Sequence, residues 1–382
     1  MTPWPTKKLG EIAAVQMGQS PPGETYNSDG VGLPFFQGKA EFGDEYPTTV
    51  KWCSQPLRVA EAGDILLSVR APVGPTNFAA ERCCIGRGLA AIRTDPKVCN
   101  QRYVRYYMKR FEADIAAHGV GSTFSAISRN DIVRLGLPVP PLADQERIAK
   151  LLDEADDLRK LRAQADRRTA ELIPALFYEM FGDPANNPLC LPVRTLGSLC
   201  RVVGGGTPSK KQSTYWAGKI PWVSPKDMTT DEIHDSEDHI SELALRESAT
   251  QLIPMESVLI VTRSGILRHT LPVAINKVPV AINQDIKAFV PNEECYSIFL
   301  AAQLRAMAPN ILNLVRIGAT VQNIETEALR RVPVLTPTFP RQKKFAMRVA
   351  EIRRLESEQT ASCLRLDALF QSLLHRAFRG DL

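Results

Sequence analysis

Residues 64–70, DILLSVR, recur 193 positions later as residues 257–263, SVLIVTR. Both are short aliphatic runs, and runs of this length between turn-forming residues indicate buried β-strands. A segment that occurs twice in one chain suggests that a whole folding unit occurs twice, and such a repeat determines the architecture.

Further matches lie on both sides of this strand, at offsets that grow from 187 to 197 and never decrease. They pair residues 8–12 with 195–199, 18–21 with 205–208, 34–36 with 221–223, 121–123 with 318–320, and Gln145, Leu158 and Phe181 with Gln342, Leu355 and Phe378. Because the matches stay collinear over the whole chain, we predict two copies of one unit, the second with small loop insertions.

Within each copy the pattern changes once, from short β-rich runs to an apolar stripe at helical spacing. Prolines mark both changes, because proline cannot continue a helix or a central strand. We predict an α+β fold with two pseudo-symmetric, strand-rich domains at residues 1–141 and 186–337. They are followed by long helices at residues 142–185 and 338–382.

The two predicted helices carry opposite charge. Residues 142–185 have 7 basic and 10 acidic side chains, a net charge of −3, whereas residues 338–382 have 9 and 5, a net charge of +4. Since each also has an apolar stripe, we expect the helices to pair antiparallel; the alternative is that each packs on its own domain. Pro174 is expected to kink or break the first helix near residues 170–173.

Composition sets limits on location and partners. The chain has 382 residues, 44% of them hydrophobic, and no apolar run approaches the roughly 18 residues of a membrane helix. The N-terminal residues do not resemble a signal peptide, so a cytoplasmic protein is expected. The net charge of +5 favours DNA binding only weakly.

The residue patterns typical of enzymes are absent from the sequence. No phosphate-binding GxxxxGK[ST], GxSxG or HExxH pattern occurs. Residues 204–211, GGGTPSKK, resemble the first, but the lysine spacing is wrong and Pro208 lacks an N–H. The eight cysteines include no CxxC pair, and no metal site is expected. We therefore expect a protein without catalytic residues and without a cofactor of its own.

Four segments resemble those of one family. They are residues 63–74 (GDILLSVRAPVG), 140–149 (PPLADQERIA), 180–184 (MFGDP) and 221–228 (PWVSPKDM). Together they are similar to the specificity subunit of type I restriction–modification systems, over essentially the whole chain.

The resemblance implies a division of labour. Each strand-rich domain would be a target recognition domain that reads one half of a bipartite double-stranded DNA sequence. The helices would set the spacing and dock two methyltransferase subunits, to which two restriction subunits can be added. S-adenosylmethionine, ATP and magnesium would belong to those partners.

Candidate DNA-contacting residues are polar or basic side chains near strand ends and glycine-rich turns. Lysines suit phosphate contact, and amides suit adenine. The candidates are Gln37, Lys39, Arg70, Lys210, Lys211, Ser224, Lys226, Arg263, Gln322 and Asn323, with Ser125 and Ala126 as the counterparts of the last two.

Two alternatives remain open at this point. The chain would serve equally as the recognition subunit of a methylation-only or other defence system, or, less favoured, as a coiled-coil protein adaptor. The target bases and the spacer length are not readable from the sequence, and mapping methylated adenines in the host genome would reveal both.

Overall fold

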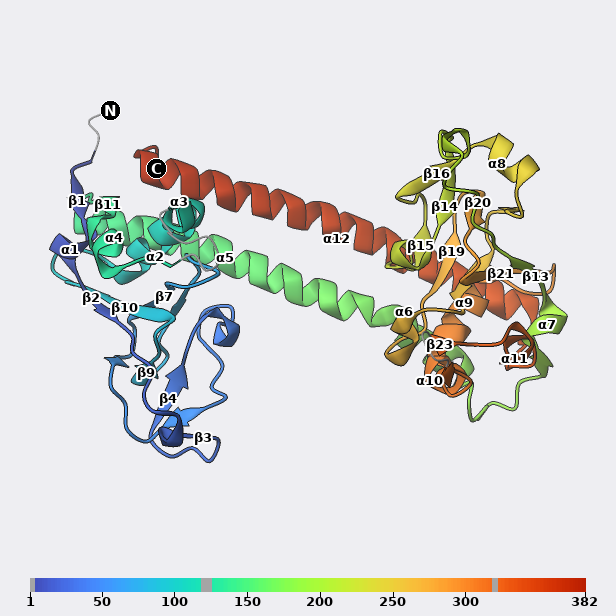
Figure 1. Cartoon of the computed structure of the whole chain (residues 1–382), viewed down its shortest axis with the longest axis horizontal. Helices are drawn as coiled ribbons and strands as arrows, with labels where there is room; N and C mark the ends of the chain where they lie inside the picture. Colours follow the sequence, from blue (N-terminus) through green and yellow to red (C-terminus); the bar gives the residue numbers. More distant parts are fainter. Residues whose placement is uncertain (1–3, 118–125, 318–321) are drawn as a thin grey trace. The chain divides into compact units, whose positions relative to one another are not determined.

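The computed structural model describes residues 4–117, 126–317 and 322–382, which divide into two compact units (Figure 1). Unit 1 contains Met1–Ala163 and Ala361–Leu382, and unit 2 contains Gln164–Thr360. Each unit therefore combines a strand-rich region with one end of each long helix. In the described part of the chain, no helix is long and apolar enough to span a membrane.

Unit 1 has a four-stranded antiparallel sheet of order β2-β10-β7-β8 and a five-stranded sheet of order β3-β5-β4-β9-β6, with β4 and β9 parallel. A separate pair, β1 and β11, closes the domain. The strands are β1 (Thr6–Lys8), β2 (Ala13–Met17), β3 (Tyr26–Asn27), β4 (Leu33–Phe36), β5 (Trp52–Cys53), β6 (Val59–Ala60), β7 (Ile65–Ser68), β8 (Thr76–Phe78), β9 (Cys83–Ile85), β10 (Leu89–Thr94) and β11 (Gly136–Pro138).

Unit 2 repeats this topology except at the sheet edges, where β15 is added in parallel to β19 and the other sheet has four strands rather than five. Its sheets have the orders β13-β21-β18-β19-β15 and β16-β14-β20-β17, with β14 and β20 parallel and β12 paired with β24. The strands are β12 (Val193–Thr195), β13 (Cys200–Gly204), β14 (Ile220–Val223), β15 (Glu232–Ile233), β16 (Asp238–Ile240), β17 (Leu252–Ile253), β18 (Val258–Val261), β19 (Val273–Asn276), β20 (Val280–Ile282), β21 (Ile286–Pro291), β22 (Arg316–Ile317), β23 (Gln322–Asn323) and β24 (Pro333–Leu335).

The recurring strand is β7 in unit 1 and β18 in unit 2, and it separates two cores in each. Alternate side chains of a strand point to opposite faces. Ile65 and Leu67 accordingly lie in one cluster and Leu66 in another. Val258 and Ile260 are likewise separated from Leu259. Burial on both faces explains why the repeat is a continuous aliphatic run.

Short helices pack against the sheets, and the long helices form one end of each unit. The short α-helices are α1 (Leu9–Ile12), α2 (Gln101–Arg110), α3 (Glu112–Ala117), α4 (Arg129–Arg134), α7 (Leu196–Leu199), α8 (Glu242–Glu247), α9 (Ser297–Ala306), α10 (Ala308–Leu312) and α11 (Thr326–Arg330); 3₁₀ turns span Gly23–Thr25, Lys39–Glu41, Ser213–Tyr215, Pro225–Asp227 and Gly265–Arg268. The long helices are α5 (Leu142–Ala170), α6 (Leu172–Phe181) and α12 (Phe339–Arg379). The predicted break at Pro174 is confirmed, because α5 ends at Ala170 and α6 starts at Leu172.

Within each unit the long helices pack on their own domain and also pair with each other, so both arrangements considered from the sequence occur. In unit 1 α5 and the end of α12 pack on α2, where Tyr103 contacts Phe378. In unit 2 α6 and the start of α12 pack on α9 through Phe177, Phe299 and Phe345. The helices are also antiparallel to each other within each unit, with ion pairs Arg159–Asp367 at 2.6 Å in unit 1 and Glu179–Arg348 at 3.9 Å in unit 2.

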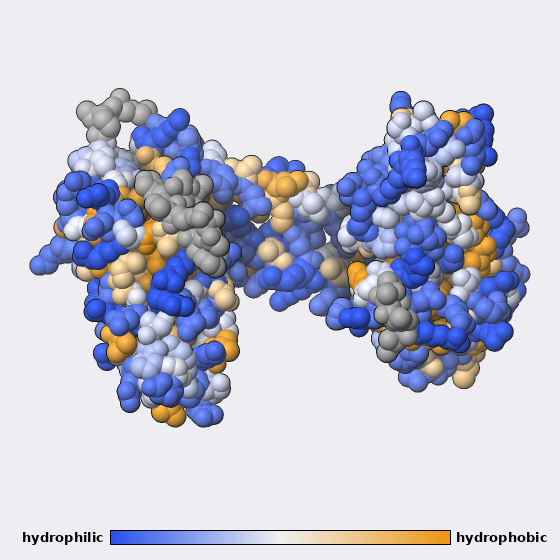
Figure 2. All heavy atoms as spheres, in the orientation of Figure 1, coloured by the Kyte–Doolittle hydropathy of each residue, from blue (hydrophilic) through white to orange (hydrophobic). Residues whose placement is uncertain are grey.

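The expected match of acidic with basic residues is present in unit 2, as Glu179–Arg348, but not for the acidic residues Asp153 and Asp156 in unit 1. Asp153 and Asp156 of α5 bind Arg102 and Lys109 of α2 instead. The apolar stripe is also only partly covered, since Leu158 and Leu161 are 54% and 61% exposed. Figure 2 shows a mostly hydrophilic surface on which such hydrophobic patches are scattered.

Candidate nucleic-acid interface

In unit 1 four loops meet where strands β2, β4, β7 and β9 end. We call residues 18–22, 37–39, 70 and 86–88 the loop end of unit 1. Gly86 N donates to Phe36 O at 2.8 Å, and Val69 N donates to Gly88 O at 2.9 Å. A Cβ atom on Gly88 would lie 2.1 Å from Gln37 O, so only glycine allows this approach of one loop to the next.

Unit 2 builds the same loop end from residues 205–211, 224–227, 263 and 283–285. Asn283 N donates to Val223 O at 2.9 Å, as Gly86 does to Phe36. Thr262 N donates to Asp285 O at 2.7 Å, as Val69 does to Gly88. The backbone contacts are therefore shared, although the side chains differ.

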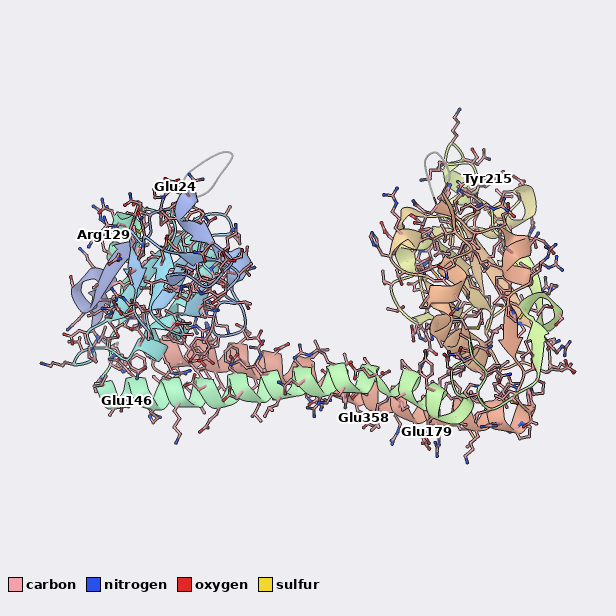
Figure 3. All side chains as sticks on the ribbon, turned by 90° about the horizontal axis from the view of Figure 1, so that it is seen from below. Glu24, Arg129, Glu146, Glu179, Tyr215 and Glu358 are labelled. Atoms are coloured by element: carbon pink, nitrogen blue, oxygen red, sulfur yellow. The ribbon has the colours of Figure 1, made fainter. Side chains whose placement is uncertain are left out.

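Figure 3 shows where these ends lie within each unit. Glu24, which follows the first loop of unit 1, lies far from Glu146 of α5. Tyr215, which follows the first loop of unit 2, lies far from Glu179 of α6 and Glu358 of α12. Each unit thus has a loop end and a helix end.

The unit 1 candidates surround the 86–88 loop. Gln37, Lys39 and Arg70 are exposed. Arg70 also forms a β-bridge to Ala126, the second residue of the predicted Ser125–Ala126 counterpart. Ser125 itself, like the matched segments 121–123 and 318–320, lies outside the described residues. In the part of the chain that the structure describes, neither Lys39 nor Arg70 has an ion-pair partner.

The unit 2 candidates are more constrained. Lys226 binds Asp238 and Glu237, each at 2.9 Å, and these hydrogen bonds raise the pKa of its ammonium group. Ser224 is buried and donates to Asp227, which caps the Pro225–Asp227 turn. Lys210 and Lys211, by contrast, are exposed at a turn.

The remaining candidates lie on the 263 side of this loop end. Arg263 is bound to Asp285 at 2.8 Å and forms a β-bridge to Asn323, as Arg70 does to Ala126. Gln322 is only 6% exposed, with its amide against Arg268, so reading a base would require its side chain to turn outward. Its role stays a prediction.

Sequence reasoning missed Arg87 and Gln284, which are exposed at the middle of the 86–88 and 283–285 loops. The signal was present, because these segments align at the same offset of 197 as the segments that follow them. The alignment alone does not mark a site, because the two residues differ in type and their loops are positioned by strands that are distant in the sequence.

A groove of about 1390 Å³ in unit 2 extends from the helix end to Lys226 and Asp227 of the loop end. Ile173, Pro174 and Phe177 of α6 line one side, and Asp231 and Glu232 face Arg353 of α12 across it. These ion pairs of Arg353 join α12 to the domain.

Comparison with known proteins agrees with this architecture. The family described as "Type I restriction modification DNA specificity domain" matches residues 1–167 and 191–361. The chain belongs to this family. The resemblance inferred from the sequence is thereby confirmed, as is the α+β fold class. Subunits of this family are non-catalytic, act in DNA sequence specificity, and assemble with the subunits that hold the catalytic activities.

Three relatives illustrate the similarity. A putative type I restriction enzyme MjaX specificity subunit of Methanocaldococcus jannaschii is 41% identical over 45% of this chain and 42% of its own. The EcoR124I/EcoR124II specificity subunit of Escherichia coli is 32% identical over 64% of this chain and 61% of its own. These two alignments thus span less than two thirds of either relative. A chain solved in a study of type I R-M complex assembly and conformational transition superposes with a TM-score of 0.67 at 19% identity, over 100% of this chain and 99% of that one.

Proposed function

We propose that this chain is the specificity subunit of a type I restriction–modification complex and reads a bipartite target, one half-site with each loop end. The observation that carries the proposal is the pair of loop ends, which share their backbone hydrogen bonds and differ in their side chains. Two such readers on one chain suit two different half-sites at a fixed separation, since half-site spacing mirrors protein geometry.

The helix end of each unit supports the second part of the proposal, the docking of two methyltransferase subunits. Leu158, Leu161 and Leu364 are 54%, 61% and 67% exposed on α5 and α12 in unit 1. Leucines exposed on a pair of long helices suit contact with another protein. Restriction subunits, where the system has them, would join the same complex, and S-adenosylmethionine, ATP and magnesium would be held by those partners.

The DNA-contacting residues in this proposal are those of the two loop ends. Lys39 and Arg70 of unit 1 and Lys210 and Lys211 of unit 2 would neutralise phosphates, because exposed cations give most of the non-specific affinity. Gln37 and Asn323 would face base edges. Lys226 and Arg263 would contribute once DNA competes for them with the carboxylates that now bind them.

A domain exchange tests the proposal. Residues 1–141 are replaced by the corresponding segment of a relative, chosen to keep Tyr103 and Tyr106, which pack on Phe378 and Phe370 of α12. Coexpressed with its methyltransferase subunits, the hybrid should change one half-site of the methylated sequence and keep the other. A change in both half-sites would refute the two-reader arrangement, and methyl transfer by the purified chain alone would refute the non-catalytic role.

A further inference from the structure

Arg87 and Gln284 occupy one structural position in the two units. The parallel pairs β4–β9 and β14–β20 align Phe36 with Ile85 and Val223 with Ile282, so Arg87 and Gln284 each lie two residues beyond a matched pair. Both loops contact the first loop of the loop end, but through different atoms. Arg87 N donates to Ser20 Oγ at 3.3 Å through the backbone, whereas in unit 2 Thr207 Oγ1 donates to the side-chain Oε1 of Gln284, which DNA would have to share or displace.

At both positions one exposed side chain projects from a fixed backbone. Gly86 and Gly88 are buried on either side of Arg87, with Gly88 pressed against Gln37 O. In unit 2 the neighbours hold each other instead, because Asp285 N donates to Asn283 Oδ1 at 3.0 Å. Equivalent loops are thus fixed by different contacts, close glycine packing in unit 1 and a hydrogen bond in unit 2. A fixed backbone limits the movement of the exposed side chain that it carries.

The guanidinium of Arg87 is available to a ligand. Within the described residues it has no hydrogen-bond or ion-pair partner, and the neighbouring Lys39 and Arg70 are also unpaired there. The planar guanidinium of Arg87 suits a base edge in a DNA groove, and Lys39 and Arg70 on the neighbouring loops suit phosphates. Arginine binds guanine O6 and N7 in a bidentate manner, and glutamine binds adenine N6 and N7.

We propose that the 87/284 position is a base-reading position of both domains, with Arg87 contacting a guanine in the half-site of unit 1 and Gln284 an adenine in that of unit 2. The inference rests on the proposed function and deepens it. A position at which the strand pairing is shared and the side chain differs is the kind of site that gives two half-sites different sequences.

The test uses the chain coexpressed with its methyltransferase subunits, and the methylated sequence is mapped across the host genome. Arg87→Gln should lower the preference for guanine at one position of one half-site by about tenfold to a hundredfold, the range of one bidentate contact. Arg87→Lys should do the same, because an ammonium group keeps the charge but loses the fork. Gln284→Arg should alter one position of the other half-site.

The matched control is Arg82→Gln. Arg82 precedes β9 at the opposite end from Arg87, and its side chain is 63% exposed beside Glu61. This variant should leave the methylated sequence unchanged. Because all of these side chains are exposed, the variants should melt like the parent chain.

Three results would overturn the inference. An unchanged sequence with uniformly weaker methylation in Arg87→Gln would mean that Arg87 touches a phosphate, and unchanged sequences in all variants would mean no base contact. A change in both half-sites from one substitution would contradict the assignment of one position to each domain. A parent chain that gave no bipartite methylated sequence would refute the proposed function as well. The three results above concern the variants only, so failure of the inference can be distinguished from failure of the proposed function.

Discussion

The loop ends of the two units share one backbone but present different charges to a ligand. In unit 1, Lys39, Arg70 and Arg87 have no ion-pair partner within the described residues. In unit 2, Lys226 and Arg263 are bound to carboxylates, and glutamine replaces Arg87. A duplicated fold has therefore kept the scaffold that positions its side chains while the balance between free and paired cations has diverged.

The helix ends differ in a complementary way. Asp156 of α5 lies among cations, with Lys109 at 3.4 Å and Arg159 at 3.0 Å. The residue 197 positions later is Arg353 of α12, which lies among acids, close to Asp231 and Glu232. The sign of the charge has been inverted at an equivalent place, so each helix fits its own domain.

Replacement of the equivalent buried glutamine should lower the free energy of unfolding equally in both units. This is the largest effect that we expect. Gln145 is fully buried and bonds Asn100 N, Val98 O and Pro140 O, while Gln342 bonds Tyr296 N, Glu294 O and Pro337 O. Gln145→Leu and Gln342→Leu should each lower the free energy of unfolding by about 3 kcal/mol, because one buried and two part-buried backbone groups lose their partner. Calorimetry measures the loss.

The exposed Gln371→Leu on α12 is the control for that pair and should cost almost nothing. A large loss for one buried glutamine with a small loss for the other would show that the two scaffolds are not energetically equivalent.

The inverted charges give the next largest effect. Asp156→Asn should destabilise unit 1 by about 2 kcal/mol, because the mostly buried Lys109 loses the carboxylate that binds it. Arg353→Gln should cost unit 2 less, because Asp231 and Glu232 keep Arg305 and Lys277 as partners. Chemical denaturation of the purified variants measures this. Restoration of stability in Asp156→Asn by the second change Lys109→Met would support the account, and additive losses would count against it.

The same two sites should respond oppositely to acid. Burial alone would raise the pKa of Asp156, but Lys109 and Lys160 outweigh it and hold that pKa below its ordinary value. The stability from Asp156 is therefore present above about pH 4 and is lost as the pH falls further. Burial raises the pKa of Glu356 in unit 2; Arg353 opposes the rise, and Asp231 and Glu232 reinforce it. Mild acid should thus stabilise unit 2, as melting temperatures measured against pH would show.

Several features of the fold were predictable because they depend on local pattern. The repeat, the strand at residues 64–70 and the break before Pro174 all follow from periodicity or from the chemistry of proline. The partners of the charged side chains were not predictable. Net helix charge indicated a match of α5 with α12, but Asp156 binds Lys109 of α2, a contact between residues 47 apart.

The candidate site shows the same limit. Strand ends indicated Lys39 and Lys226 correctly as neighbours of a loop, yet only the folded chain brings Glu237 and Asp238 to Lys226. Gln322 was chosen for its amide, and its burial depends on β22 and Arg268. Residue type indicates possible chemistry, whereas availability is a property of tertiary contacts.

The unequal cations should appear in the salt dependence of DNA binding, on the proposed function. Lys39→Ala should reduce the slope of log affinity against log salt by about one, the effect of one phosphate contact. Lys226→Ala should change the slope less, because DNA must first displace Asp238 and Glu237. Fluorescence titrations of the assembled complex with its target DNA at several salt concentrations measure both slopes.

Releasing Lys226 should make the two loop ends more alike. The double variant Glu237→Gln and Asp238→Asn should steepen the salt dependence and tighten binding, and Lys226→Ala added to it should reverse the gain. Equal slopes for Lys39→Ala and Lys226→Ala in the parent chain would show that the ion pairs of unit 2 do not restrain its lysine.

The smallest effect is expected from substitution of Pro174, whose counterpart 197 positions later is Gln371 of α12. Pro174 is the third residue of α6, which starts at Leu172 after the break. An N–H in the first turn of a helix has no intrahelical partner, so the missing N–H of Pro174 costs little there. Pro174→Ala should therefore change the free energy of unfolding by less than about 1 kcal/mol, also because the less restricted unfolded chain offsets any gain in helix. Gln371 lies inside the unbroken α12, and Gln371→Pro should cost about 3 kcal/mol or more. Circular dichroism during thermal unfolding compares the two; a large stabilisation by Pro174→Ala would mean that the break at Glu171 is imposed by the proline against the preference of the surrounding contacts.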